Sequence, residues 1–338
     1  MNENELIIHI GTSKTGTTSL QQFLYVNKNN LLNQGYIYPD FLEKVPCNYY
    51  NANKYAFING FGLYYASYDR SPYGKEIFAS IMSNVQDCLR ENNVILSCEC
   101  FWDLDVEDFI RRVRKYCKNI RVIVYLRRQD EFLEAYWSEC VRYEFTREDR
   151  TLEEYVEASE ENGIARYIDK LIALNDIVRN KLTVRLYDKN ELRGGDIILD
   201  FLYCLGLDED EINWENVDRA NSQLPPSVLE IKRVYNRLAK EKNWPIQYDL
   251  LFNDQVFLEQ KETLPGQKIM PLALRHKIMT SHKTENEKIA NLFFGGRTKP
   301  LFTEISNNSI VAEYHESTCL EKTLINLLFL SIERVKNF

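Results

Sequence analysis

A glycine-rich stretch near the start of the chain carries the clearest chemical pattern. Residues 9–20 read HIGTSKTGTTSL, in which Gly11 and Gly16 have the separation of the two glycines in a Walker A loop, G-x-x-x-x-G-K-[ST]. The lysine, however, is Lys14, which lies inside the loop and three residues earlier than a Walker lysine. Backbone N–H groups at the start of a helix bind phosphate or sulfate without the help of a lysine. The stretch therefore predicts an anion site whose lysine has another task.

The position of Lys14 indicates which anion fits. In a Walker loop the lysine contacts the β- and γ-phosphates and a hydroxyl binds Mg²⁺, because a triphosphate needs a metal clamp. A lysine inside the loop is poorly placed for that, but it can reach the bridging oxygen of a leaving group and stabilise the charge that develops there. We expect Lys14 to act on such an oxygen, while Thr17 and Thr18 offer hydroxyls to the anion.

Four apolar runs predict the strands that position this loop. They cover residues 5–10, 93–98, 120–126 and 181–188. Residues 17–29 have apolar side chains at helical spacing, and residues 105–117 show the same period between two of the strands. Strand, helix and strand in this order are typical of a parallel sheet. The predicted fold class is α/β, a P-loop-type parallel β-sheet flanked by helices.

The rest of the chain is predicted to be mostly helical and to belong to a single domain over residues 1–338. Further helices are predicted over residues 129–145, 151–160, 164–180, 196–207 and 225–242. Residues 243–338 form a C-terminal extension, predicted to be irregular over 243–310 and to hold a buried helix over 324–332. No low-complexity linker marks a domain boundary.

Residues 36–75 form an insert between the first helix and the second strand. The insert holds nine of the 21 tyrosines, together with Asn48, Asn51, Asn53 and Asn59. Tyrosine rings stack on sugars and amides bond sugar hydroxyls, so this composition suits the acceptor side of a carbohydrate site. Packing of the same tyrosines onto the sheet is the alternative, and the sequence leaves both open.

The overall composition excludes several classes of function. A net charge of −8 and a pI near 5.3 argue against a general nucleic-acid binder, whose affinity comes mainly from neutralising phosphates. No apolar run approaches the ~18 residues of a membrane span, and the N-terminus lacks the basic region of a signal peptide. Eight cysteines without a CxxC pair and four histidines give little support to a zinc site. Reduced thiols of a cytosolic protein are the expected state.

Two motifs in this order resemble sulfotransferases that use 3′-phosphoadenosine 5′-phosphosulfate (PAPS). GTSKTGTTSLQ, residues 11–21, is similar to their 5′-phosphosulfate loop. VIVYLRRQDEFLEAYWS, residues 122–138, is similar to their strand that ends in an arginine and leads into a helix. Patches at residues 188–208, 221–238 and 285–302 resemble later segments of bacterial members. The resemblance implies the P-loop sulfotransferase fold and a bacterial member that acts on carbohydrate.

The resemblance also implies which residues bind PAPS and its product, 3′,5′-adenosine bisphosphate, with no metal required. In the loop these are Gly11, Thr12, Ser13, Lys14, Thr15, Gly16, Thr17 and Thr18. Arg127 stands where the family has its arginine for the 3′-phosphate. The family's serine, eight residues later, is Ala135 here, and we expect Ser138, one helical turn on, to take its place.

Three further residues are candidates for the site. Glu99 follows the strand 93–98 and matches a Ser-Glu position of bacterial relatives, which implies a general base; an ion pair with Lys14 or Arg127 is the alternative. Asp40 lies where some members place a catalytic carboxylate. Arg297, in FGGR, could close over the nucleotide as part of a glycine-rich lid, or belong to an ordinary surface loop. His9 is expected to be a core residue.

The leading hypothesis is a bacterial, cytoplasmic sulfotransferase that transfers a sulfuryl group from PAPS to a hydroxyl of a glycan, glycolipid or other acceptor by in-line displacement. A P-loop kinase or NTPase is the alternative enzyme. It is disfavoured by the displaced Lys14 and by Arg127, where a Walker B strand would end in an acid, and is supported by Glu99. A third reading is a non-catalytic nucleotide-binding protein, because the serine is absent at position 135. No nucleic-acid partner is expected, and peripheral membrane attachment stays open.

Overall fold

The computed structural model describes residues 4–40, 58–207, 214–215, 226–246, 249 and 268–305. The chain divides into two compact units, and the single domain over residues 1–338 stays a prediction. The first comprises residues 1–128, 166–220 and 285–303, and the second comprises residues 129–165, 221–284 and 304–338. Each unit is described by itself.

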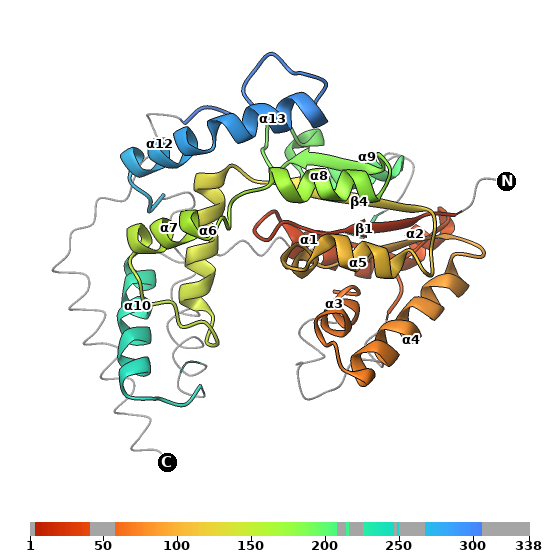
Figure 1. Ribbon diagram of the computed structural model, residues 1–338, viewed down its shortest axis with the longest axis horizontal. Helices are drawn as coiled ribbons and strands as arrows, with labels where there is room; N and C mark the ends of the chain where they lie inside the picture. Colours follow the sequence, from red (N-terminus) through yellow and green to blue (C-terminus); the bar gives the residue numbers. More distant parts are fainter. Residues whose placement is uncertain are drawn as a thin grey trace. The chain divides into compact units, whose positions relative to one another are not determined.

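The first unit is built on a parallel sheet of five strands (Figure 1). In chain order these are β1 (Leu6–His9), β2 (Tyr36–Ile37), β3 (Asn93–Ser97), β4 (Ile120–Leu126) and β5 (Leu182–Leu186). Their order across the sheet is β2-β3-β1-β4-β5, and every neighbouring pair is parallel. The predicted α/β fold with a parallel sheet is confirmed, and its four predicted strands are present. The two-residue β2, inside the insert, was not predicted.

The register of the sheet brings the ends of its central strands to one level. His9 at the end of β1 lies opposite Ser97 at the end of β3 and opposite Ile123 in β4. The chain adds β2 and β3 on one side of β1, then crosses over to add β4 and β5 on the other side. In open α/β sheets such a reversal of strand order is where ligands bind, at the carboxyl ends of the strands. The loop after β1 therefore starts at this point.

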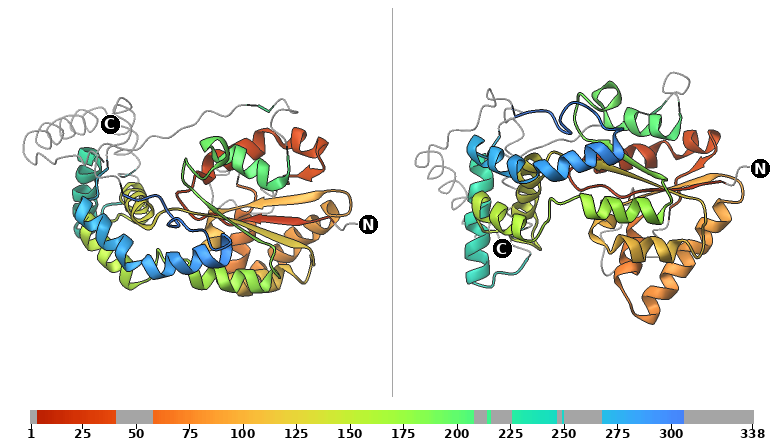
Figure 2. Two further views of the ribbon diagram at one scale, coloured as in Figure 1. Left: turned by 90° about the horizontal axis from the view of Figure 1, so that it is seen from above. Right: turned by 45° about the horizontal axis from the view of Figure 1, so that its top comes forward.

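Helices cover both faces of the sheet (Figure 2). One face carries α1 (Thr17–Val26), α2 (Lys28–Asn33) and α9 (Ile197–Leu205), and the other carries α4 (Pro72–Cys88), α5 (Val106–Val113) and α8 (Ile168–Ile177). The strands read as continuous apolar runs because both of their faces are buried. The short α3 (Phe61–Tyr68) packs against α4, and the 3₁₀ turns η3 (Glu99–Asp103) and η4 (Arg193–Gly195) follow β3 and β5 along the chain.

The insert over residues 36–75 is only partly described, and its tyrosines differ in burial. Tyr38 is buried in the core, and the hydroxyl of Tyr36 donates to the carbonyl of Leu205 at 2.7 Å. Tyr68 and Tyr73 are exposed. Tyr64 and Tyr65, on α3, are half-buried, and Asn59 is buried with its amide donating to the carbonyl of Ile95 at 2.8 Å. The members of the predicted carbohydrate surface at 48–55 lie outside the described residues. Packing thus accounts for the first tyrosines of the insert and for Asn59, and the carbohydrate surface stays a prediction.

The regular structure in the described part of the second unit is helical. Its helices are α6 (Gln129–Arg142), α7 (Leu152–Glu161), α10 (Pro226–Glu241) and α12 (Leu272–Ser281). The prediction of an irregular segment over 243–310 is wrong for α12 and for the following α13 (Lys283–Phe293). Pro271 is the N-cap of α12, with φ of −58°, so the helix begins directly after a proline. The predicted helix over 324–332 lies outside the described residues.

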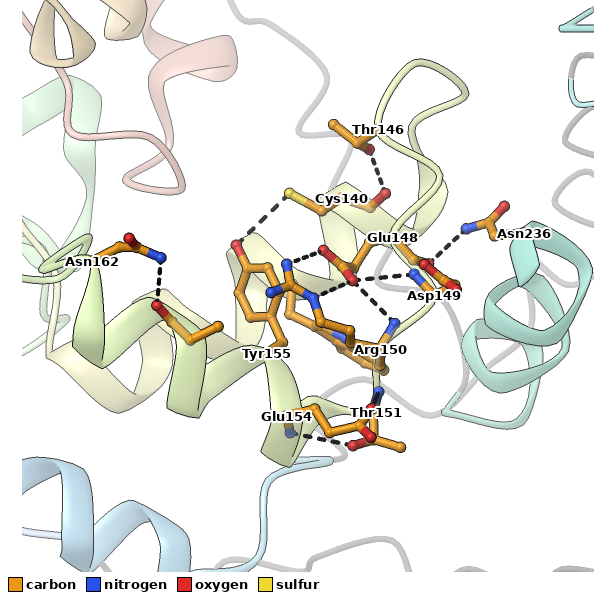
Figure 3. Close-up of polar contacts among 12 residues, drawn as sticks. Cys140, Thr146, Glu148, Asp149, Arg150, Thr151, Glu154, Tyr155, Asn162 and Asn236 are labelled. Carbon is orange, nitrogen blue, oxygen red and sulfur yellow. Dashed lines mark hydrogen bonds and ion pairs between the residues drawn. The ribbon is translucent and has the colours of Figure 1, made fainter. Parts of the chain in front are cut away.

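The connection from α6 to α7 is held by Glu148 (Figure 3). Its carboxylate accepts a 2.8 Å hydrogen bond from Nε of Arg150 and bonds from the backbone N–H groups of Asp149 and Arg150. Asn236, on α10, donates to the backbone carbonyl of Glu148 at 2.8 Å. Thr151 then begins α7 through a reciprocal capping box with Glu154. The second unit thus has its own polar scaffold.

A buried carboxylate joins β4, β5 and α9 in the first unit. Asp200 is fully buried and accepts hydrogen bonds from the hydroxyl of Tyr125 at 3.0 Å, Nε of Arg185 at 2.8 Å and the backbone N–H of Arg193 at 2.9 Å. Burying an ion pair is costly unless every group is bonded, and here three donors satisfy one carboxylate. Because Tyr125 also holds the glycine-rich loop, this network fixes the floor of the site.

We predict that Asp200→Ala destabilises the protein by about 3 kcal/mol, because it leaves the Arg185 guanidinium without its buried partner. Asp176→Ala, on the exposed side of α8, is the matched control and should change stability by less than ~0.5 kcal/mol. Urea unfolding followed by circular dichroism measures both. Equal midpoints for the two variants would contradict the structural role of Asp200.

Candidate active site

The glycine-rich loop is anchored to β4 by its own backbone. The N–H of Tyr125 donates to the carbonyl of Gly11 at 2.7 Å, and the N–H of Thr12 donates to the carbonyl of Tyr125 at 3.0 Å. The hydroxyl of Thr12 bonds the same carbonyl, and the hydroxyl of Thr15 donates to the carbonyl of Thr12 at 2.6 Å. Thr12 and Thr15 are fully buried, so their hydroxyls hold the shape of the loop. Any contact they make with a bound anion is through the backbone.

The two glycines occupy positions that admit no side chain. Gly11 has φ of 93° and Gly16 has φ of 75°, a region that L-residues other than glycine avoid. A Cβ on Gly16 would also lie 3.2 Å from the hydroxyl of Tyr187, and one on Gly11 would lie 3.1 Å from Cα of Glu99. The predicted need for glycine at both positions is explained by backbone conformation and by these close neighbours.

The first turn of α1 is suited to an anion. Gly16 is its N-cap and offers no side-chain hydrogen bond to the orphan N–H groups, and no acidic residue lies in the first turn. These N–H groups and the helix dipole favour negative charge at this end. Thr17 is buried, whereas Thr18 is exposed, so only the second threonine presents its side chain to solvent.

Lys14 is half-buried in the middle of the loop, and Ser13 before it has similar exposure. Lys14 has φ of 63°, the left-handed region that costs a non-glycine residue roughly 1–2 kcal/mol. Such conformations persist where the surrounding structure imposes them, and they are frequent at functional sites. The backbone of Lys14 therefore keeps its left-handed conformation at an energetic cost.

Arg127, two residues beyond Tyr125, reaches back to the loop. Its Nη1 donates to the carbonyl of Lys14 at 2.8 Å, and its guanidinium lies over the ring of Tyr187 with 5.6 Å to the centroid. The hydroxyl of Tyr167 donates to the carbonyl of Arg127 at 3.0 Å. The structure thus joins the two motifs that lie more than a hundred residues apart in the sequence.

Glu99 stands at the end of β3, beside Gly11. Its Oε2 accepts a 2.8 Å hydrogen bond from Nε2 of Gln21, which is fully buried on α1. Glu99 itself is half-buried, at the carboxyl edge of the strand next to β1. The carboxylate is therefore adjacent to the loop, as the sequence predicted, and is held by a neutral amide.

The other predicted residues lie in different surroundings. Asp40 is exposed beyond the end of β2, which β3 separates from β1. Ser138, like Ala135, is half-buried on α6, and that helix belongs to the second unit. Arg297 bonds Glu191 with 2.8 Å between Nη2 and Oε1, and Lys299 contacts the same carboxylate at 2.8 Å. In this structure Glu191 neutralises the two cations of the FGGR segment.

The environment of Glu191 shows how firmly it is engaged. Burial alone would raise the pKa of Glu191, but hydrogen bonds and charge from Arg297 and Lys299 outweigh it and hold the pKa below its ordinary value. The carboxylate is thus ionised at neutral pH and attracts Arg297. The side chain of Arg297 is 12% exposed, whereas Gly295, Gly296 and Thr298 beside it are exposed, so a lid and an ordinary surface loop both stay open.

Sequence reasoning missed two residues at this site, Gln21 and Tyr187. Gln21 lies on the buried face of α1, between Leu20 and Phe23. A polar residue among apolar ones on this face was the sequence feature that could have identified it. Tyr187 directly follows β5, and its N–H donates to the carbonyl of Leu126 at 2.7 Å. It thereby brings its ring to Gly16 and Arg127. The sequence alone does not place Tyr187 beside Gly16 and Arg127, because this follows from the pairing of β5 with β4.

His9 lies under the loop and is part of the core. Its Nδ1 is 2.8 Å from the hydroxyl oxygen of Ser97, and its ring packs edge-on against Tyr125 and Phe201. Its Nε2 is buried and makes no hydrogen bond within the described residues. Burial lowers the pKa of His9 to about 3, so the ring is neutral at physiological pH.

The described residues contain no cluster of three or more side chains able to hold a metal ion. Across the same part of the chain, no helix has the length and apolar character that a membrane crossing requires. Six cysteines are described, all as free thiols, and Cys98 and Cys117 are the buried ones among them.

Comparisons with known proteins give distant similarities. No family model matches the chain. An uncharacterized protein of Archaeoglobus fulgidus is 27% identical over 220 residues, which are 62% of this chain. The chain spans only 56% of the length of that curated relative.

Two solved structures are similar at low identity. The sulfotransferase from Alicyclobacillus acidocaldarius aligns with a TM-score of 0.38 and 15% identity, covering 70% of this chain and 95% of its own. The sulfotransferase domain of the Synechococcus PCC 7002 olefin synthase aligns with a TM-score of 0.37 and 15% identity, covering 78% and 97%. Because these TM-scores are below 0.5, the fold rests on the strand order of the sheet, and any function rests on the chain's own residues.

We predict that the burial of His9 makes the protein sensitive to acid. The unfolded state takes up a proton on this ring below about pH 6.5, whereas the folded state resists it until about pH 3. Folding stability should therefore fall as the pH drops through this window, by up to ~1.4 kcal/mol per pH unit.

His9→Asn should flatten the pH dependence of the urea midpoint between about pH 6.5 and about pH 4.5, because the titrating group is gone. His276→Asn, at an exposed position of α12, is the control and should keep the wild-type slope. The comparison uses slopes, so a constant loss of stability in His9→Asn does not matter. An unchanged slope in His9→Asn would contradict the prediction.

Proposed function

We propose that this protein is a PAPS-dependent sulfotransferase that transfers a sulfuryl group to a hydroxyl of a glycan, glycolipid or similar acceptor. The observation that carries the proposal is the hydrogen bond from Arg127 to the carbonyl of Lys14. It joins a phosphate-type loop with a displaced lysine to a strand that ends in arginine. An enzyme that clamps Mg²⁺ on a triphosphate would be expected to place an acid at that strand end.

The residues present fit a phosphosulfate. The uncapped first turn of α1 and the absence of acids there favour an anion. The buried hydroxyls of Thr12 and Thr15 keep the loop backbone in place. Lys14 and Arg127 add positive charge on one side of the loop, and Tyr187 supplies a ring face beside Arg127. PAPS, when bound, would supply the activated sulfuryl group and leave as 3′,5′-adenosine bisphosphate.

In the proposed reaction the acceptor oxygen bonds to sulfur as the bond from sulfur to the bridging phosphate oxygen breaks. Lys14 stabilises the negative charge that collects on that bridging oxygen. Glu99, beside Gly11, takes the proton from the acceptor hydroxyl and later releases it to solvent. Asp40 stays the second candidate for this proton transfer. Arg127, Ser138 and Arg297 are proposed to bind the nucleotide, which for Arg297 requires its release from Glu191.

The partner groups follow from this proposal. The acceptor side is assigned to residues 36–75, where Tyr68 and Tyr73 remain exposed. The acceptor is a glycan, glycolipid or other hydroxyl compound rather than a nucleic acid, and a cytoplasmic enzyme of bacterial type is proposed, with peripheral membrane attachment if the acceptor is a lipid. No metal takes part in the proposed transfer.

We predict that 3′,5′-adenosine bisphosphate stabilises the protein in the absence of Mg²⁺, and that Mg·ATP does so far less. At a ligand concentration about a hundred times Kd, the expected gain is roughly 2.7 kcal/mol. A thermal-shift titration with both nucleotides, with and without EDTA, measures it. Stabilisation by Mg·ATP alone would instead support the kinase or NTPase alternative.

We predict that Lys14→Ala lowers kcat for sulfuryl transfer by roughly a hundredfold or more, because charge on the leaving oxygen loses its partner. The assay follows transfer from radiolabelled PAPS to a panel of methyl glycosides. Lys118→Ala, at an exposed position before the amino end of β4, is the control and should keep wild-type activity. Binding of adenosine bisphosphate without any transfer by the wild type would favour a non-catalytic nucleotide-binding protein.

A further inference from the structure

The side-chain amide of Gln21 has one well-defined partner, and it is Glu99. Nε2 of Gln21 donates to Oε2 of Glu99 at 2.8 Å, across 78 positions of sequence. Gln21 is fully buried on the face of α1 that packs on the sheet, whereas Glu99 is half-buried at the carboxyl edge of β3. The amide thus reaches the carboxylate from the interior and leaves its outer side to solvent.

The other end of the same amide argues against a purely structural role. Oε1 of Gln21 is buried and accepts no hydrogen bond within the described residues. A buried carbonyl oxygen without a partner is unfavourable, whereas an apolar side chain of the same length would fill the space without that penalty. The flanking core positions on this helix, Leu20, Phe23 and Leu24, are apolar. Packing alone therefore does not explain a glutamine here.

Hydrogen bonding to one carboxylate oxygen has a specific consequence for a base. A carboxylate with both oxygens free can rotate and offer either of them, whereas one fixed oxygen orients the other. With Oε2 bound to Gln21, Oε1 of Glu99 is the oxygen left for a substrate. A neutral amide donor also holds the carboxylate and leaves its negative charge in place. An arginine at the same position would neutralise that charge.

We propose that Gln21 is a positioning residue for the reaction: it fixes Oε2 of Glu99 so that Oε1 takes the proton of the acceptor hydroxyl. The inference rests on the proposed function, because it assigns Gln21 to the base of that same site. The proton moves from the acceptor oxygen to Oε1 of Glu99 as the new bond to sulfur forms, and afterwards passes to solvent. Gln21 itself exchanges no proton.

Several titratable groups surround Glu99 and bear on the test. On its own segment Cys98 and Asp103 interact with it electrostatically, and burial raises the pKa of both. Tyr64 of α3 and Lys170 of α8 face Asp103. The glycine-rich loop, which packs against Glu99 at Gly11, carries Lys14. All of these groups stay in place when Gln21 is replaced, so a change in kcat can be assigned to the lost amide.

The test compares Gln21→Met with Gln22→Met. Methionine matches the length of glutamine and cannot donate a hydrogen bond, and Gln22 is the next residue on α1, half-buried and on a different face. Transfer from radiolabelled PAPS to methyl glycosides, or to water if no glycoside is sulfated, is measured as kcat and, for a glycoside, as KM. Binding of 3′,5′-adenosine bisphosphate and the melting temperature are measured for each variant.

Three results are expected for Gln21→Met. Its kcat falls roughly ten- to a hundredfold, because the base is misoriented, while nucleotide binding is unchanged. Its KM for the acceptor stays near the wild-type value, because Gln21 contacts the base and not the substrate. Its melting temperature equals or exceeds that of the wild type, because the unsatisfied carbonyl is gone. Gln22→Met should resemble the wild type in every measurement.

The possible failures are distinguishable. A wild type that neither binds adenosine bisphosphate nor transfers sulfuryl groups overturns the proposed function and this inference with it. An active wild type whose Gln21→Met variant keeps the kcat of Gln22→Met overturns the role of Gln21 alone. A marked fall in the melting temperature of Gln21→Met, with KM and nucleotide binding altered along with kcat, assigns Gln21 to structure and also overturns it.

Discussion

The site depends on one extension of the β-ladder. β1 ends at His9, yet the chain continues to pair with β4 through the two hydrogen bonds between Tyr125 and residues 11–12. This extra step holds the glycine-rich loop against the carboxyl end of β4 rather than letting it project into solvent. Since Arg127 comes two residues after Tyr125, its guanidinium can reach the carbonyl of Lys14. The same step places Gly11 beside Glu99, because β3 pairs with the other edge of β1.

The sequence predicted the parts of this site that follow from the order of the strands in a parallel sheet. Continuous apolar runs marked the four longer strands, and parallel strands present their carboxyl ends at one edge. The loop, Glu99 and Arg127 each follow one of those runs, so their meeting could be inferred from order alone. β2 has only two residues and no pattern that periodicity could detect. The helices α12 and α13 lie between Pro271 and the glycines at 295–296, two kinds of residue that are typical of loops, and the segment around them was predicted to be irregular.

Side-chain partners were less predictable, for a physical reason. Which donor a buried carboxylate finds depends on distances of a few tenths of an ångström between elements far apart in sequence. The sequence offered Lys14 or Arg127 as the partner of Glu99, and the structure adds the neutral Gln21. It likewise gave no sign that Glu191 neutralises Arg297. The amide at position 21 was visible as a polar residue on an apolar face, but only the fold identifies what it faces.

The charge balance of the first unit constrains how a donor nucleotide could engage the FGGR segment. Arg297 and Lys299 share the carboxylate of Glu191, and Lys299 is largely exposed. Exposed ion pairs contribute little to stability, so the pair of Lys299 with Glu191 would be broken at small cost. Arg297 is nearly buried, and separating it from Glu191 requires another anion to take the place of the carboxylate. A phosphate group meets that condition, since it offers charge and several acceptor oxygens. Under the proposed function, binding of a nucleotide by Arg297 would therefore be an exchange of anions, in which a phosphate of the nucleotide replaces Glu191 as the partner of the arginine.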